Sequence, residues 1–218
     1  MPCDLLIKNG LVIDGTGAPA RRADVGISNG KISSIENEIR EKATRTIDAS
    51  GLAVAPGFID PHTHYDAQIC WDGALTPSSW HGVTSVVMGN CGVGIAPCRP
   101  ATREIAMHDL VNVEAIPFEV LKQGITWDWE TFPQFMDAAA ARKPSLNLGF
   151  LAPLTPFRHY VMGEASMERA ASDAETAEIK KLLGEAMDAG AFGFSSTPIW
   201  RVNATSIAPL FFSLSTLA

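Results

Sequence analysis

The sequence predicts an α/β protein in which a small β-rich segment precedes a parallel sheet. Residues 3–50 contain short alternating hydrophobic runs interrupted by Asn-Gly pairs, which is typical of antiparallel strands. After residue 51 continuous apolar runs alternate with helical patterns. Such alternation is typical of a parallel sheet covered by helices.

The β-rich segment contains two hairpin signals. Asn9-Gly10 and Asn29-Gly30 each lie between alternating hydrophobic residues. Both central residues of a type I′ turn need positive φ, which Asn and Gly adopt at little cost. We therefore expect two hairpins within one small sheet.

The later apolar runs have the length and composition of strands that are buried on both faces. The expected parallel strands are GLAVAPGFID (51–60), GVTSVVMGN (82–90), SLNLGFLAP (145–153) and GAFGFSSTP (190–198). The segment between residues 90 and 145 is expected to hold one helix and a long connection. Loops of that length often serve as lids.

Two helices are expected between these strands. One covers residues 131–142 and ends before Pro144, which disfavours helical backbone at the preceding residue. The other begins at Ser172, which forms a capping box with Glu175, and Gly190 ends it. Its apolar stripe consists of Ile179, Leu182, Leu183, Ala186 and Met187.

Composition narrows the class of protein. The chain has 218 residues, of which 46% are hydrophobic and 19% charged, as in ordinary globular proteins. A net charge of −7 argues against nucleic acid or anionic membrane as partner. We expect no secretory signal, because the first residues lack a basic region followed by an apolar core, and no apolar run approaches about 20 residues. We therefore expect a cytoplasmic protein whose cysteines are reduced thiols: Cys3, Cys70, Cys91 and Cys98.

A histidine pair follows the first apolar run, in PGFIDPHTHYD. In extended backbone His62 and His64 point to the same face, so both imidazoles can bind one metal ion, and Asp60 and Asp66 can orient the rings. The alternative is a chance pair of loop histidines, because short motifs give false positives. The position at the carboxyl end of a parallel strand, where sites gather, favours metal ligation.

Cys91 lies in VVMGNCGVG, just past the carboxyl end of the second apolar run and so on the same rim as the histidine pair. A thiolate is a good zinc ligand and can bridge two ions. The alternative is a small buried residue, which is the usual state of a free cysteine. The rim position favours ligation.

Arg158 and His159 lie in PLTPFRHYVMG, which follows the third apolar run on the same rim. Loops at this rim often contact substrate, and the planar guanidinium of arginine can bind a carboxylate. We interpret both residues as candidate substrate-binding residues. The alternative for Arg158 is an ordinary surface arginine.

The β-rich start with Asn-Gly pairs, then VAPGFIDPHTHYD and GVTSVVMGNCGVG, resembles the metal-dependent amidohydrolase superfamily. The branch that it resembles is the N-acyl-D-amino-acid deacylases, or D-aminoacylases. The resemblance runs from about Asp4 to about Trp200. The H-x-H after PGFID is shared by the superfamily, whereas GNCG is more specific to this branch, in which the cysteine replaces a modified lysine as metal ligand.

The resemblance implies a fold and its limits. Residues 1–54 would form a β-rich part of a small sandwich domain, and residues 55–200 about four of the eight strands of a TIM-like (β/α)₈ barrel. Residues 201–218 would form an atypical tail, for which we expect disorder.

The resemblance also implies hydrolysis of a non-peptide amide bond in a small N-acyl amino acid, by a water activated on one or two zinc ions. His62, His64 and Cys91 carry over as metal ligands.

The departures from the family are also informative. The family supplies two further metal-binding histidines and a general-base aspartate from later strands, and no histidine or aspartate follows Ser195. We therefore expect the general-base aspartate beyond the end of this chain and assign no catalytic residue within it. A truncated, inactive fragment or zinc-binding remnant is one alternative, and a cyclic amidohydrolase of the hydantoinase or dihydropyrimidinase kind is another. The open edges of a half-barrel would favour self-association.

Overall fold

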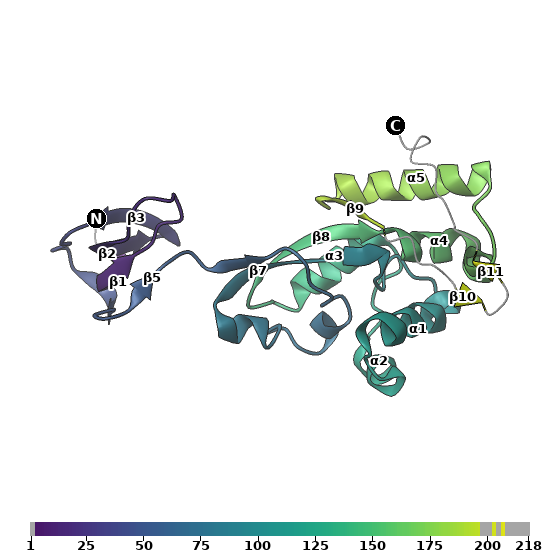
Figure 1. Ribbon diagram of the computed structural model, residues 1–218, viewed down its shortest axis with the longest axis horizontal. Helices are drawn as coiled ribbons and strands as arrows, with labels where there is room; N and C mark the ends of the chain where they lie inside the picture. Colours follow the sequence, from purple (N-terminus) through teal and green to yellow (C-terminus); the bar gives the residue numbers. More distant parts are fainter. Residues whose placement is uncertain (1–2, 197–201, 204–205, 208–218) are drawn as a thin grey trace. The chain divides into compact units, whose positions relative to one another are not determined.

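The computed structural model describes residues 3–196, 202–203 and 206–207 and divides the chain into two compact units, Met1–Gly57 and Phe58–Ala218 (Figure 1). The predicted tail falls almost wholly outside the described residues. Only two short paired strands are described there, β10 (Val202–Asn203) and β11 (Ser206–Ile207).

The first unit is a five-stranded sheet around its first strand. β1 (Cys3–Val12) pairs antiparallel with β2 (Arg21–Ser28), which pairs antiparallel with β3 (Lys31–Glu36). On its other side β1 runs parallel to β4 (Ala43–Asp48) and to β5 (Ala53–Val54). The buried centre of this sheet consists of Val12, Ala23 and Val25.

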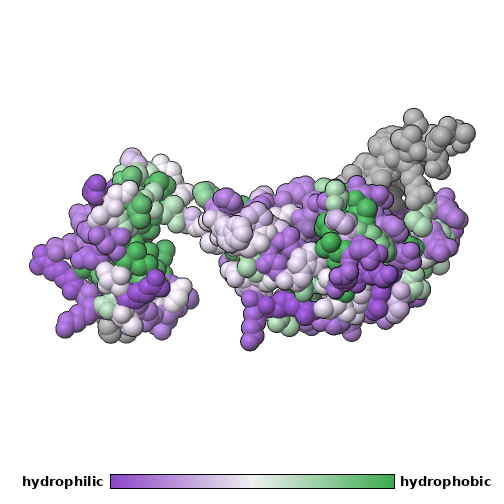
Figure 2. All heavy atoms as spheres, turned by 90° about the horizontal axis from the view of Figure 1, so that it is seen from below, coloured by the Kyte–Doolittle hydropathy of each residue, from purple (hydrophilic) through white to green (hydrophobic). Residues whose placement is uncertain are grey.

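One of the two predicted hairpins is confirmed. Asn29 and Gly30 join β2 to β3 with φ of 52° and 70°, the positive values that a type I′ turn requires. Some large apolar side chains of this unit are exposed at its surface (Figure 2), including Ile32 and Leu52.

The hairpin predicted at Asn9-Gly10 is wrong, because both residues lie inside β1. The pairing of β1 with β2 shifts there, and Asn9 has φ of 63°. Some β-bulges, like type I′ turns, place a residue at positive φ, so the Asn-Gly pair indicated the backbone conformation of Asn9 correctly but not the element. Asn9 is held by its backbone N–H, which donates to Asp24 Oδ1 (2.8 Å), and by its amide, which donates to Asp48 Oδ1 (2.9 Å).

The second unit contains the predicted parallel sheet. Its order is β6 (Phe58–Asp60), β7 (Val83–Met88), β8 (Asn147–Pro153) and β9 (Gly193–Ser195). Every neighbouring pair is parallel, and the sheet curls as half of a TIM-like barrel. The predicted α/β class and partial barrel are confirmed, and the carboxyl ends of all four strands meet at one rim.

Both predicted helices are confirmed. α5 (Asp173–Asp188) begins at the capping box formed by Ser172 and Glu175, and α3 (Phe132–Ala141) begins at a second box, at Thr131. The two helices contact each other and β8 (Figure 1). They bury the apolar positions Phe132, Phe135, Ala139, Ile179, Leu183 and Ala186.

The long connection predicted between residues 90 and 145 is largely helical, which corrects that prediction. Besides α3 it holds α1 (Arg103–Glu114) and α2 (Phe118–Gly124). α1 buries only Ala106, Met107 and Leu110, a stripe too narrow to give a clear helical period. The remaining helix, α4 (Leu154–Met162), follows β8. Short 3₁₀ turns cover Gln68–Cys70, Ser78–His81, Asn90–Gly92, Pro100–Thr102 and Gly163–Met167.

Helices and sheet share one hydrophobic core. Aromatic side chains dominate it: the ring centroids of Trp129 and Phe135 lie 5.0 Å apart, and those of Phe132 and Phe157 5.7 Å apart. Each such side chain contributes roughly 1.5–3 kcal/mol through burial. Val86 and Met88 of β7 are fully buried within this core. The core thus fixes the strand ends that form the rim.

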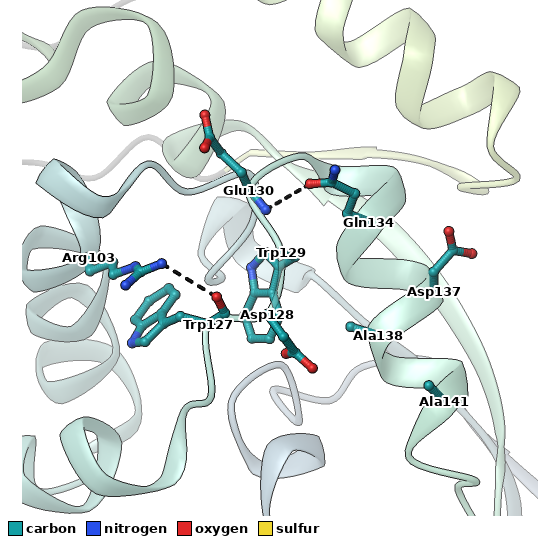
Figure 3. Close-up of a pocket in the computed structure, with 9 residues that line it drawn as sticks. All are labelled: Arg103, Trp127, Asp128, Trp129, Glu130, Gln134, Asp137, Ala138 and Ala141. Carbon is teal, nitrogen blue, oxygen red and sulfur yellow. Dashed lines mark hydrogen bonds between the residues drawn. The ribbon is translucent and has the colours of Figure 1, made fainter.

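A surface recess of about 610 Å³ lies between α3 and the segment that leads into it (Figure 3). Trp127 and Trp129 line it, and the Arg103 guanidinium donates to the Trp127 carbonyl (3.4 Å). None of the predicted site residues lines this recess. In the described part of the chain, no helix is both long and apolar enough to cross a membrane.

Candidate metal centre

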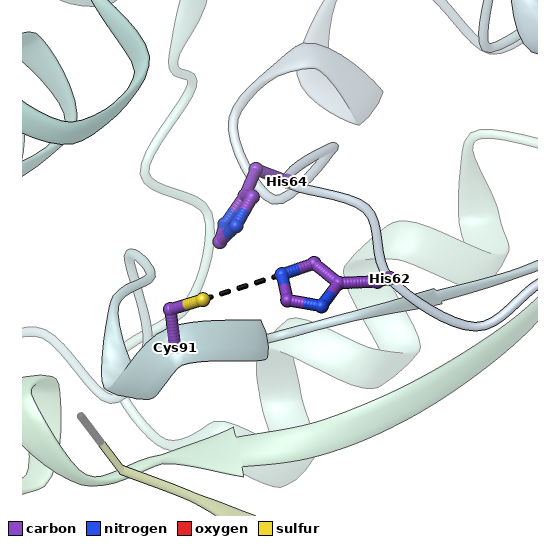
Figure 4. Close-up of side chains that lie close together, drawn as sticks. All are labelled: His62, His64 and Cys91. Atoms are coloured by element: carbon purple, nitrogen blue, oxygen red, sulfur yellow. Dashed lines mark hydrogen bonds between the residues drawn. The ribbon is translucent and has the colours of Figure 1, made fainter.

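The structure brings His62, His64 and Cys91 together at the rim (Figure 4). One potential ligand atom from each lies within 4.8 Å of the other two. Cys91 Sγ is 3.2 Å from His62 Nε2, and the two imidazole centroids are 5.4 Å apart. Ligands bound at 2.0–2.3 Å in a tetrahedral site are about 3.5 Å from one another. The three side chains therefore fit one zinc ion, and their role as ligands stays a prediction.

The histidine loop is fixed by the residue between its two histidines. Thr63 donates to the Val87 carbonyl from both its backbone N–H (3.0 Å) and its hydroxyl (2.7 Å). Because side chains alternate along extended backbone, Thr63 faces β7 and the flanking His62 and His64 face away from it. The HTH triplet thus places both imidazoles on the open side of the rim.

The cysteine loop turns through a run of positive φ. Gly89, Cys91 and Gly92 have φ of 80°, 56° and 71°. A side chain at Gly89 would collide with the Leu151 carbonyl, so only glycine fits there. Cys91 is the one residue of the three that is not glycine, and left-handed backbone costs a non-glycine residue about 1–2 kcal/mol. Strain of this kind is characteristic of functional positions.

Ser195, at the end of β9, holds the cysteine loop from the other side. Its hydroxyl accepts from the Gly92 N–H (2.9 Å) and donates to the Gly89 carbonyl. Asn90 adds a link to the histidine loop, because its amide donates to the carbonyls of Thr63 (3.3 Å) and Val87 (2.9 Å). Our sequence reasoning missed both residues, although Ser195 follows an apolar run on the correct rim.

The nearby aspartates hold backbone and not the imidazole rings, which differs from our expectation. Asp60 accepts from the backbone N–H of His62 (3.2 Å), and Asp66 accepts from that of Gly89 (3.2 Å). Asp66 is buried, and this burial raises the pKa of its carboxyl to about 7. The two aspartates therefore shape the loops that carry the candidate ligands.

His64 has surroundings that suit a metal ligand. Its Nδ1 is buried and has no hydrogen-bond partner among the described residues. Burial lowers the pKa of the imidazole, the Glu114 carboxylate opposes this effect, and His62 adds to it. A lowered pKa keeps the ring neutral, and only the neutral ring can bind a metal ion.

The other cysteines of this unit are less suited to bind metal. Burial raises the pKa of the thiols of Cys70 and Cys98 to about 11. They are therefore protonated at neutral pH, whereas a metal ligand must be a thiolate. Cys91 is only partly buried and is the cysteine that lies beside the two histidines.

Arg158 and His159 lie in α4 and are not part of the group at the rim. Arg158 is buried and donates to the carbonyls of Ser166 (2.7 Å) and Arg169 (3.0 Å). His159 is buried between the Ser166 hydroxyl (2.6 Å) and Asp109 Oδ2 (2.9 Å). These contacts are all within the protein, and a role of either residue in substrate binding stays a prediction.

The curled parallel sheet covered by helices defines a barrel-type α/β fold. Two histidines and a cysteine at its carboxyl rim form a candidate site for one or two metal ions. The chain belongs to the amidohydrolase family: residues 45–203 match the model described as "Amidohydrolase family".

Relatives from one branch of this family match most of the chain. It is 38% identical over 195 residues to a D-aminoacylase of Alcaligenes xylosoxydans xylosoxydans and 36% identical over 193 residues to an N-acyl-D-aspartate deacylase of the same organism. The crystal structure of N-acyl-D-glutamate deacylase from Bordetella bronchiseptica, with zinc and a phosphonate inhibitor, matches with a TM-score of 0.76 at 32% identity. The resemblance to the D-aminoacylase branch is thereby confirmed.

The chain spans about two fifths of the length of these relatives. The matches cover 89%, 88% and 94% of this chain but 38%, 36% and 40% of the respective relatives.

Proposed function

We propose that the protein is a metal-dependent amidohydrolase that removes the acyl group from N-acyl-D-amino acids. The observation that carries this proposal is the convergence of His62, His64 and Cys91, whose candidate ligand atoms lie within 4.8 Å of one another. The relatives that share this part of the chain act on D-amino-acid derivatives, according to their names. The substrate would accordingly be a small molecule with an amide bond.

A bound zinc ion would lower the pKa of a water to about 7 and polarise the amide carbonyl. This chain contributes the ion's surroundings. His62 would offer Nε2, Cys91 its thiolate and His64 a neutral imidazole. The ties through Thr63 and Ser195 hold both loops in place before an ion arrives, which reduces the ordering cost of binding.

The test is to measure zinc content and hydrolysis on the same purified sample. N-acetyl derivatives of neutral D-amino acids, D-aspartate and D-glutamate form the substrate panel, and the L-enantiomers are the control. His62→Ala and Cys91→Ala should each lower zinc content and abolish hydrolysis. His81→Ala, at an exposed histidine outside the group, should change neither. The proposal fails if His62→Ala leaves both zinc content and hydrolysis unchanged.

A zinc-binding module without turnover is the second candidate. The strands β8 and β9 end at Pro153 and Ser195, neither of which can bind metal strongly or act as a general base. Zinc bound near one ion per chain without hydrolysis of any substrate would favour this candidate. Adding a hydantoin and a dihydropyrimidine to the panel tests the cyclic-amide alternative in the same experiment.

A further inference from the structure

α1 ends directly beside the candidate metal centre. Its last residue, Glu114, places Oε1 3.6 Å from Nε2 of His64, and both side chains are largely buried. We propose that Glu114 is a positioning residue that fixes the orientation and the tautomer of the His64 imidazole. The proposal rests on the role proposed above for His64 as a metal ligand.

Local helix energetics do not explain a carboxylate at this position. The carboxyl end of a helix carries partial negative charge, so a Glu there costs about 0.3–1 kcal/mol, and no basic residue lies in the last turn of α1 to offset it. The next residue, Ala115, has φ of 53°, a conformation that favours Gly. Two unfavourable features therefore coincide at the point where the helix meets His64.

The rest of α1 is anchored firmly enough to position a side chain. Asp109 accepts from His159 Nε2 (2.9 Å), and His159 is fixed in turn by Ser166. On the same helix Met107 and Leu110 are buried in the core. The backbone that carries Glu114 is thus tied to α4 as well as to the core. This also gives His159 a structural role.

The surroundings of the two ring nitrogens of His64 differ. Nε2 faces the Glu114 carboxylate, whereas Nδ1 is buried without a hydrogen-bond partner among the described residues. A carboxylate beside Nε2 favours the proton on that nitrogen and leaves the lone pair on Nδ1. At 3.6 Å the contact is longer than a hydrogen bond, and an approach of about 0.5 Å would make it one. Glu114 is not in the group of mutually close ligand atoms, so it acts on His64 and not on the ion.

The chain offers a matched control on the same helix. Glu104 Oε1 lies 3.9 Å from His108 Nε2, also an acid–histidine pair, but both side chains are exposed and neither belongs to the group of three candidate ligands. Glu104→Gln therefore removes the same charge from α1 without touching His64. The isosteric change Glu114→Gln and the truncation Glu114→Ala are compared with it.

The first measurement is the zinc affinity of the full 218-residue chain. Loss of a carboxylate that orients a metal-binding histidine typically weakens metal affinity by about 10–100-fold. We expect a loss of this size for Glu114→Ala, a smaller loss for Glu114→Gln, and wild-type affinity for Glu104→Gln. Equal affinity in wild type and Glu114→Ala would overturn the proposal.

The second measurement is the tautomer of His64 in the metal-free chain, read from long-range ¹H–¹⁵N NMR correlations at a pH where the ring is neutral. We expect the proton on Nε2 in the wild type and a mixed population in Glu114→Ala. A proton on Nδ1 in the wild type would overturn the proposal. If the wild type binds no zinc, the metal assignment fails, and the tautomer measurement still decides the role of Glu114.

Discussion

Single hydrogen bonds to backbone atoms hold the candidate metal centre in shape. Ser195 is the clearest case, because its hydroxyl spans the Gly89 carbonyl and the Gly92 N–H on either side of Cys91. Cys91 itself sits in left-handed backbone, which persists only when the surroundings enforce it. The geometry of the candidate ligand Cys91 therefore depends on Ser195, which is not itself a candidate ligand.

Ser195→Ala should weaken zinc binding without unfolding the chain. The change leaves the Gly92 N–H without its acceptor, at a cost of about 1–3 kcal/mol, and lets the Cys91 turn relax. Zinc affinity measured by competition with a chelator should fall, while far-UV circular dichroism stays the same. The neighbouring Ser196 is exposed, so Ser196→Ala is the matched control. An unchanged zinc affinity in Ser195→Ala would show that the Cys91 turn keeps its conformation without the Ser195 hydrogen bonds.

Gly89→Ala should destabilise the protein more than backbone strain alone can explain. Gly89 and Gly17 have nearly the same φ, 80° and 85°, but a Cβ at Gly89 meets the Leu151 carbonyl whereas a Cβ at Gly17 meets nothing. Gly17→Ala thus measures the strain, about 1–2 kcal/mol, and Gly89→Ala adds the collision. Urea unfolding should give a clearly larger loss for Gly89→Ala. Equal losses would mean that β8 can shift to make room.

At the scale of elements, helix starts and turns could be predicted where the local sequence alone determines them. The capping boxes at Thr131 and Ser172 and the hairpin at Asn29 depend on neighbours within a few residues. The prediction of a turn at Asn9 was wrong because the choice between bulge and turn depends on Asp24 and on the pairing of β1 with β4, both distant in sequence.

The site followed the same division between local and distant signals. The convergence of His62, His64 and Cys91 could be predicted, because strand ends on one rim can be inferred from apolar runs. Ser195 and Glu114 were not, since neither lies in a motif and each reaches the site only through tertiary packing.

Glu175 makes the stability of the start of α5 depend on pH. Hydrogen bonds from Arg169, and then from Ser172, lower the pKa of its carboxyl from 4.5 to about 2. A lowered pKa in the folded state means that the ionised group stabilises the fold above about pH 4.5 and that this stabilisation is lost as the pH falls toward 2. Glu175→Gln should therefore be less stable than the wild type at pH 7, and the difference should shrink at low pH.

The measurement is the urea midpoint of both proteins between pH 7 and pH 2.5. The control is Glu178→Gln, which removes a glutamate whose partner on the same helix is the exposed Lys181, at 3.5 Å. This variant should differ little from the wild type at any pH, because exposed ion pairs contribute little. A Glu175→Gln difference that stays constant across the pH range would refute the electrostatic explanation.

At the scale of the molecule, we propose that residues 1–54 are the β-rich part of a sandwich domain and residues 55–200 the first half of a (β/α)₈ barrel. The sheet order β6-β7-β8-β9 supports the second statement, because each strand pairs in parallel with the next. In the described residues, β6 and β9 each have a strand on one side only. Their open backbone groups can pair with another chain.

These edges lead us to expect that the 218-residue chain self-associates. Large apolar side chains are exposed at both: Phe58 and Ile59 in β6, and Phe192 next to β9, which is 75% exposed. A positive charge on an open edge opposes strand pairing, so Phe192→Lys should shift the average mass toward the monomer. Light scattering after size exclusion, over a hundredfold range of protein concentration, measures this mass.

Trp80→Lys is the matched control for this experiment. Trp80 is 76% exposed but lies in a short 3₁₀ turn before β7, outside the edge strands β6 and β9. Both changes remove a similar amount of exposed apolar surface. If the edges drive association, Phe192→Lys therefore reduces it and Trp80→Lys does not. Equal reduction by both changes would point to nonspecific hydrophobic association. A wild-type chain that stays monomeric at every concentration would mean that the edges are protected.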